Sequence, residues 1–237
     1  MSEISKAAQS VIDYLGCEYV HIPEGTELLE VNETYDELFA KRAEGDYIPI
    51  VFGIEHPMEF DSDQHSADLQ KEVFAAPVLD AEKWFRDEIA RYIDEFDNDW
   101  DGVVGEMENG EAMHGFSGIM DFGTGKSMEC VIAKIPVKNP WEIFAWFPFG
   151  GWNECPAPEV MLWVGKYWYE KYGAIPALMT RDVLEFRASP VADKKAAMDL
   201  ALEQFVFCSD IVFQGVETIG ALADSLTKST TWYFWWD

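Results

Sequence analysis

The sequence contains no hydrophobic run of the roughly 18–20 residues that a membrane-spanning helix needs. Its four cysteines, Cys17, Cys130, Cys155 and Cys208, include no C-x-x-C pair, and its four histidines follow no metal-ligand or catalytic-triad spacing. Basic residues are scarce, with 17 Lys and Arg against 44 Asp and Glu. These absences predict a cytoplasmic protein with reduced thiols, and they support no enzyme class.

The net charge of −27 is concentrated in the N-terminal half of the 237 residues. Residues 1–128 hold 30 acidic side chains against 8 basic ones, whereas residues 129–237 hold 14 against 9. Such a field repels nucleic acid and anionic membranes, so neither is expected as a partner. It suits cations or a basic protein surface. Acidity that serves only solubility is the alternative, and composition does not separate the two.

Hydrophobic periodicity and turn residues predict an α+β fold, with a mixed sheet and flanking helices. We expect helices over 5–15, from Asn32 or Thr34 to about 45, and over 80–96, 158–171, 194–207 and 218–226. We expect strands over 18–22, 27–31, 47–54, 128–135, 174–178 and 183–188. Pro49 favours an edge or a bulge for its strand, and residues 55–79 are expected to be loop.

The chain ends in five consecutive aromatic residues and an aspartate, WYFWWD. Each aromatic side chain has about 150–250 Å² to bury, so the segment is expected to form a strand that closes the core. Alternation places Trp232, Phe234 and Trp236 on one face and Tyr233 and Trp235 on the other.

One acidic segment matches the calcium loop pattern D-x-[DN]-x-[DN]-G-x5-E. The ligands it would supply are oxygen atoms, as Ca²⁺ prefers. They come from the side chains of Asp97, Asp99, Asp101 and Glu108 and the backbone carbonyl of Val103. In EF-hand proteins a helix follows this loop and a second loop pairs with it. Here Asn109-Gly110 interrupts the helix expected after the loop, and the sequence holds no second loop of this pattern. The alternative is an acidic linker that fits the pattern by composition. Apart from this calcium, no cofactor is expected.

A second candidate is the aromatic segment WEIFAWFPFGGWNECP at residues 141–156. Its paired glycines allow a tight turn beside aromatic rings, and polar side chains follow, a combination typical of ligand pockets. The residues concerned are Trp141, Glu142, Trp152, Asn153, Glu154 and Cys155. The alternative is a buried loop held by Trp146 and Trp152.

The segments PWEIFAWFPFGGWNECPAPE, YWYEKYGA, LEQFVFCSDIVFQGVETIGALADSL and WYFWWD resemble the bacterial domain-of-unknown-function family 4253. The resemblance covers residues 128–237, and residues 1–127 are expected to form an acidic N-terminal region packed on that half. The family brings no established activity, cofactor or catalytic residue. The resemblance implies a bacterial cytoplasmic protein. Polar residues of these motifs are candidates to converge in space: Asn153, Cys155, Cys208, Asp210 and Gln214.

The sequence is consistent with three functions. The leading interpretation is a non-enzymatic binding protein whose acidic surface takes a basic partner, as in immunity proteins that neutralise toxins or nucleases. The second is a calcium-binding regulator that uses the loop 97–108. The third is a small-molecule enzyme with its site near residues 141–155. Oligomeric state is not predicted.

Overall fold

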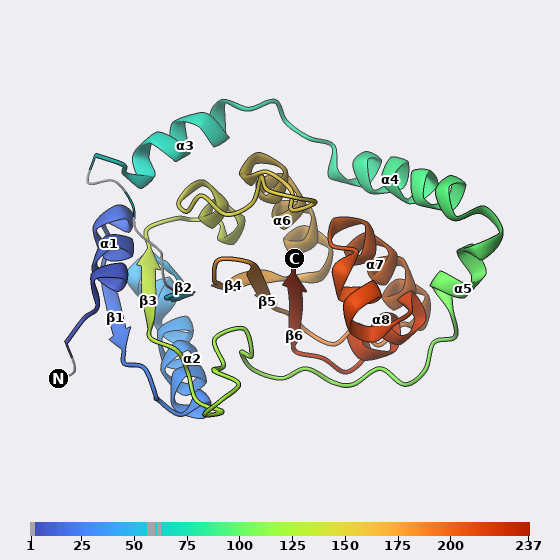
Figure 1. Ribbon diagram of the computed structural model, residues 1–237. Helices are drawn as coiled ribbons and strands as arrows, with labels where there is room; N and C mark the ends of the chain where they lie inside the picture. The colour runs from blue at the N-terminus through green and yellow to red at the C-terminus, as the bar shows by residue number, and fades with distance from the viewer. Residues whose placement is uncertain (1–2, 56–59, 61–62) are drawn as a thin grey trace.

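Short apolar segments pair into one six-stranded mixed sheet in the computed structural model, which describes residues 3–55, 60 and 63–237. In spatial order the strands are β1 (Tyr19–Ile22), β3 (Cys130–Ile135), β2 (Ile48–Gly53), β4 (Ile175–Met179), β5 (Val183–Arg187) and β6 (Thr231–Trp235) (Figure 1). Strands β2 and β4 run parallel, and the other neighbours are antiparallel. The fold class is therefore α+β, as the sequence predicts.

Several helices of this fold begin where a polar side chain caps them. Ser5, Asp80 and Thr218 each accept a hydrogen bond from a backbone N–H three residues further on. The helices are α1 (Lys6–Leu15), α2 (Leu28–Gly45), α3 (Ser66–Ala75), α4 (Ala81–Phe96), α5 (Trp100–Val104), α6 (Pro158–Tyr172), α7 (Lys194–Phe207) and α8 (Ile219–Leu226). Helical turns of other types are η1 (Asp97–Asp99) and η2 (Pro140–Ala145), which are 3₁₀-helical, and η3 (Ile211–Val216), which is π-helical.

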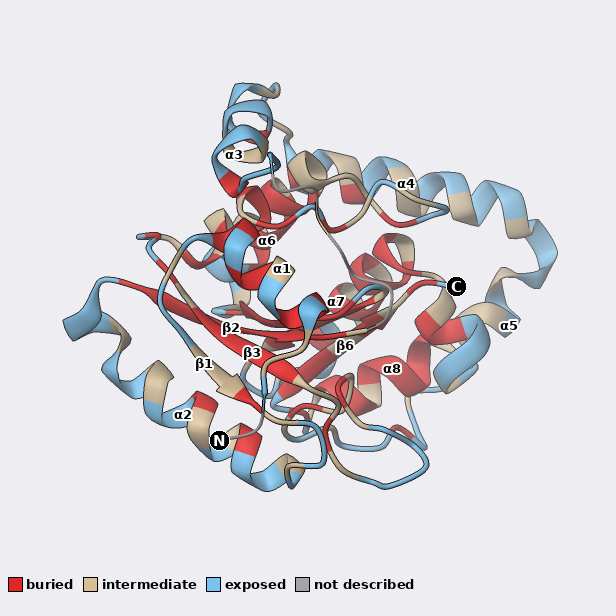
Figure 2. Cartoon of the chain, turned by 60° about the vertical axis from the view of Figure 1, so that its left-hand side comes forward, coloured by how far each residue is buried: buried red, intermediate tan, exposed pale blue. Residues whose placement is uncertain are grey.

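Two apolar layers cover the two faces of the sheet (Figure 2). The larger layer joins α1, α6, α7 and α8 to one face, and Trp168 lies within it, stacked 5.5 Å from Phe234 and 5.6 Å from Phe85. The smaller layer joins α2 to the other face through Val31 and Tyr35. Full burial of a large apolar side chain contributes about 1.5–3 kcal/mol, so these layers supply much of the free energy of folding.

The aromatic C-terminus forms β6 and alternates as expected. Trp232, Phe234 and Trp236 are buried in the larger layer, whereas Tyr233 and Trp235 are half-buried against the smaller one. The antiparallel pairing with β5 places Phe234 opposite Leu184. The prediction of a closing strand with rings on both faces is confirmed.

Three local predictions are wrong. Residues 27–31 are not a strand, because α2 already begins at Leu28. Helix α3 occupies part of the segment 55–79 that was expected to be loop, while residues 56–59 and 61–62 of that segment lie outside the described residues. Pro49 lies on an internal strand; β4 pairs with β2 only at Val51 and Phe52, so the missing N–H of Pro49 interrupts no bond to β4.

Strands from both sides of residue 128 share the sheet, because β1 and β2 precede that position and the other four strands follow it. Within the part of the chain that the structure describes, no helix combines the length and the apolar character needed to cross a bilayer.

Candidate functional site

An acidic segment crosses the outside of the C-terminal helices, and we call residues 80–113 the acidic strap. It comprises α4, η1, α5 and an extended stretch, and it runs past α6, α7 and α8 (Figure 1). The strap carries twelve acidic side chains and three basic ones. Two of the three cations are already paired within α4: Lys83 with Asp87, and Arg91 with Glu88 and Glu95. Most of the acidic charge therefore faces solvent without a partner cation of its own.

Aromatic side chains hold α4 and α5 against the body of the protein. The Phe85 ring lies 5.6 Å from the rings of Tyr167 and Trp168 on α6. Tyr92 lies 4.9 Å from Phe205 on α7. This amphipathic arrangement follows from the three- and four-residue spacing of the apolar positions, and it turns the acidic side of α4 outward.

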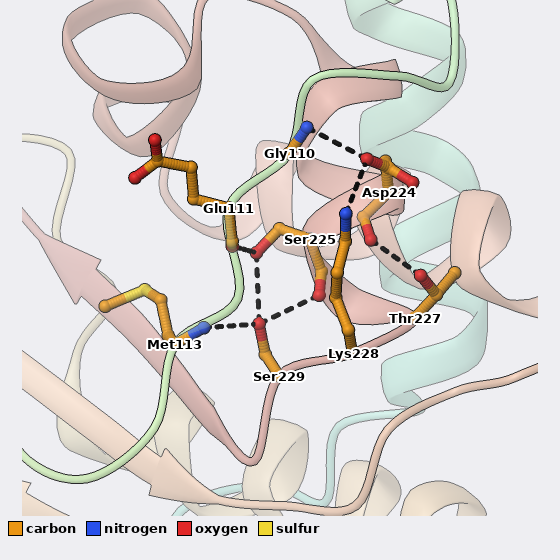
Figure 3. Close-up of polar contacts among 8 residues, drawn as sticks. All are labelled: Gly110, Glu111, Met113, Asp224, Ser225, Thr227, Lys228 and Ser229. Atoms are coloured by element: carbon orange, nitrogen blue, oxygen red, sulfur yellow. Dashed lines mark hydrogen bonds and ion pairs between the residues drawn. The ribbon is translucent and has the colours of Figure 1, made fainter.

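Hydrogen bonds attach the extended end of the strap to α8 and to Ser229, which follows this helix (Figure 3). Gly110 N donates to Asp224 Oδ2 over 2.9 Å, Ser225 Oγ donates to the carbonyl of Glu111 over 2.6 Å, and Met113 N donates to Ser229 Oγ over 2.9 Å. The carboxylate of Glu111 points away from α8 (Figure 3). The strap is thus anchored through its backbone, which leaves its acidic side chains free for other contacts.

Glycine is required where the strap meets α8. A Cβ on Gly110 would lie 2.3 Å from the carbonyl oxygen of Ala221, and a Cβ on Gly220 would lie 2.3 Å from that of Glu106. Both neighbours are backbone atoms and cannot rotate away. The close approach explains why Asn109-Gly110 is not continued as a helix: the chain is extended here and bonded to α8.

An apolar patch interrupts the acidic surface where the strap meets η3, and we call Ile93, Phe96 and Phe213 the strap patch. Ile93 and Phe213 are 41% and 47% exposed, large values for apolar side chains. The Phe96 ring lies 5.7 Å from that of Phe213. Asp94 and Asp97 adjoin Ile93 and Phe96 along the strap and are exposed. An apolar centre with a charged rim is the usual anatomy of a protein interface.

The calcium-loop residues lie within the strap, but the structure does not assemble them into a site. Asp97 and Asp99 belong to η1, Asp101 and Val103 belong to α5, and Glu108 follows in the extended stretch. Consecutive helical turns replace the loop that the pattern requires. Among the described residues, no group of three or more His, Cys, Asp or Glu side chains is placed to hold a metal ion.

The aromatic segment 141–156 begins in η2 and ends in a tight turn. Gly150 has φ +95°, and a Cβ there would lie 2.0 Å from the carbonyl oxygen of Pro156. Trp141 lies against Tyr169 with ring centroids 5.1 Å apart. Glu142 accepts hydrogen bonds from Asn139 N and Nδ2, at 3.2 and 2.9 Å, and so caps η2. These contacts fix the path of the backbone.

The remaining residues of that segment do not form a catalytic arrangement. Trp152 lies 5.2 Å from Phe149 and lines an open hollow of about 400 Å³. Glu154 is exposed. Cys155 is buried, and desolvation together with the nearby Cys208 thiol raises its pKa above the usual range. A thiol in this state is a poor nucleophile at neutral pH.

The polar residues of the C-terminal motifs converge around the last residue of the chain. Asn153 Nδ2 donates to the carbonyl of Asp237 over 2.5 Å, and Asp237 N donates to Asp210 Oδ2 over 3.2 Å. Gln214 Nε2 donates to Asp210 Oδ1 over 3.2 Å, and Cys208 Sγ donates to the carbonyl of Trp235 over 3.0 Å. Burial raises the pKa of Cys208 to about 12. The network secures the aromatic strand at its C-terminal end.

Comparison with known proteins identifies one similarity. Residues 131–237 match the model of a family described as a domain of unknown function, DUF4253, so this part of the chain resembles that family. Neither the search of curated proteins nor the search of solved structures found a match.

Proposed function

We propose that this chain is a binding protein whose acidic strap takes a basic protein surface. The observation that carries the proposal is the strap patch, where partly exposed Ile93 and Phe213 lie among unpaired acidic side chains. Acidic groups steer a basic partner to the surface and select its orientation, and a buried apolar centre supplies affinity. A cytoplasmic toxin or nuclease with a basic face, met inside a bacterium, fits this description by its chemistry.

The packing of the strap supports this proposal over a role for the acids in solubility alone. Solubility needs dispersed charge, whereas here the charge surrounds the partly exposed side chains of Ile93 and Phe213. The strap is also fixed at two places: Phe85 packs against α6, and Gly110 is hydrogen-bonded to α8. A preorganised surface loses little conformational entropy when a partner binds.

The test compares two variants with the same loss of charge. In the strap variant, Asp94, Asp99 and Asp101 are replaced by Asn; all three are exposed. In the control, Glu30, Glu33 and Glu44 on exposed positions of α2 are replaced by Gln. Binding to a panel of purified basic proteins is measured by calorimetry at low, physiological and high salt.

We expect the strap variant to bind the preferred basic protein at least tenfold more weakly than the wild type, and the control to change less than twofold. Phe213→Ser is expected to weaken binding at every salt concentration, because the apolar contact is not screened. Equal losses in the two charge variants, or binding that disappears altogether at physiological salt, would mean that the attraction is non-specific and would refute the proposal.

A further inference from the structure

A cavity of about 280 Å³ lies beside β6, between this strand, η3 and α8. Apolar side chains form most of its wall, among them Met113, Ile211, Leu222 and Leu226. The volume equals that of about nine water molecules in the liquid, and an apolar cavity of about 150 Å³ is enough for benzene. The space therefore suits one ring with a polar substituent. It is distinct from the strap patch, and no residue of the segment 141–156 lines it.

Two residues lining this cavity carry a buried N–H donor that has no hydrogen-bond partner in the described part of the chain. The two donors are Gln204 Nε2 on α7 and Trp232 Nε1 on β6, and both residues are only 1% exposed. Buried donors are almost always paired in folded proteins, so two on residues of the same lining are a signal. Two hydroxyls of the lining are bonded elsewhere and not to these donors: Ser225 Oγ donates to the carbonyl of Glu111, and Ser229 Oγ donates to that of Ser225.

The outer edge of β6 adds backbone groups to the same wall. Ala188 N donates to the carbonyl of Thr230, and Trp236 N donates to that of Asp182. Even-numbered residues of this strand therefore face β5. Because backbone direction alternates, the N–H and C=O of Tyr233 face away from β5. Tyr233 lines the cavity, and β6 is the last strand of the sheet.

The charge of the wall limits the ligand further. Asp210 is the one charged side chain among the described residues that line the cavity, and no Lys, Arg or His is among them. An anionic ligand would lose its hydration without gaining a cation. We propose that this cavity binds an uncharged, ring-sized organic molecule that offers a hydrogen-bond acceptor to Gln204 and Trp232.

Three probes of similar shape test this inference on the intact chain. Acetophenone has one ring and a carbonyl acceptor, ethylbenzene lacks the acceptor, and benzoate carries a negative charge. Titration followed by ¹H–¹⁵N NMR locates each probe through the residues whose signals shift. We expect acetophenone to shift signals of Gln204, Trp232 and Tyr233, and to bind at least tenfold more tightly than ethylbenzene or benzoate.

Variants then test the donors. Gln204→Met keeps an unbranched side chain of similar size without the N–H, and Gln9→Met on the exposed face of α1 is the matched control. Acetophenone is expected to bind Gln204→Met at least tenfold more weakly and Gln9→Met as it binds the wild type. Because the comparison of acetophenone with ethylbenzene uses only the wild type, a variant that failed to fold would leave that test intact. Equal affinity for those two probes, shifts elsewhere on the surface, or no shift at all would overturn the proposal, the last outcome meaning that water fills the cavity.

Discussion

Glu185 provides a prediction whose size can be worked out from the structure. It lies on β5 with none of its surface exposed, and its Oε1 accepts hydrogen bonds from Ser117 N, Ser117 Oγ and Gly118 N, at 3.0, 3.0 and 2.7 Å. Oε2 has no partner among the described residues. Burial outweighs these hydrogen bonds and raises the pKa of Glu185 from its ordinary value of 4.5 to about 7. The charge of Glu185 acts in turn on Tyr233, whose pKa is raised to about 12 by burial and then by Glu185, so Tyr233 does not titrate in the same range.

A carboxyl group that binds its proton more tightly in the folded chain stabilises the fold fully below pH 4.5, and this contribution declines as the pH rises to 7. One pH unit corresponds to about 1.4 kcal/mol, so the loss between these limits is on the order of 3 kcal/mol. The sign is opposite to that of a carboxylate held by a cation, because the neutral form is the one that the folded protein favours.

Urea denaturation of wild type and Glu185→Gln across pH 4.5–8 isolates this contribution, because the other ionisable groups are common to both proteins. Gln keeps an acceptor for Ser117 and Gly118 and does not titrate. We expect the free energy of unfolding of the wild type, relative to the variant, to fall by about 3 kcal/mol over this range and to level off above pH 7. A difference that is independent of pH, or that increases with pH, would refute the reasoning.

Three other predictions concern stability. Gly110→Ala is expected to destabilise the fold by about 1–3 kcal/mol, because the new Cβ overlaps α8. The Cβ of Gly102→Ala meets nothing within 4 Å, so this variant is expected to stabilise α5 by up to about 1 kcal/mol. Urea denaturation measures the free energy of unfolding of both variants. Gln204→Met is expected to stabilise the protein by about 1–3 kcal/mol in the absence of any added molecule, since it removes an unpaired buried donor, and a lower free energy of unfolding would contradict this. We expect the same melting temperature in calcium and in chelator, because no group of three or more His, Cys, Asp or Glu side chains among the described residues is placed to hold a metal ion. Calcium at one hundred times its dissociation constant would add about 2.7 kcal/mol to the free energy of unfolding, and such a shift would support calcium binding.

Elements with strong local signals could be predicted from the sequence. Helix α4 has a capping aspartate and an apolar face at helical spacing, and α6 has Pro158 at its first turn. Strand β6 was predictable because five consecutive aromatic residues have to be buried and only alternation fits them onto a sheet. In each case the local preference and the tertiary contacts agree.

The errors occur where a helix lacks a capping side chain, or where the expected capping residue is hydrogen-bonded to a distant part of the chain. Glu27 begins α2 without a side-chain cap, so the sequence does not mark the start of this helix. Asn32, which was expected to cap, instead accepts a hydrogen bond from Phe116 N, 84 residues away. Helix α3 buries only Ser66 and Val73 among its ten residues, which explains its weak periodicity.

Some candidate residues could be predicted from sequence motifs, whereas others are identified only by the packing. Asn153, Asp210 and Gln214 were selected because they belong to one set of motifs, and they do meet, but around Asp237 at the end of the chain. Gln204 and Trp232 belong to the same segments and carry no distinguishing pattern. Their significance depends on two N–H groups that have no partner among the residues the structure describes, and only the packing of α7 and β6 reveals this.

The order of the strands has a consequence for the similarity to DUF4253. The matched region, residues 131–237, contains nearly all of β3 and the whole of β4, β5 and β6. Yet β3 and β4 are not neighbours, because β2 from the N-terminal half lies between them and pairs with both. Without a strand in that place, β3 would separate from β4, β5 and β6, and the facing edges of β3 and β4 would leave two rows of backbone N–H and C=O groups without partners. A protein that contains this region therefore needs an equivalent of β2 from elsewhere in its chain or from a partner, and the acidic strap, which also comes from the N-terminal half, is attached to the same unit.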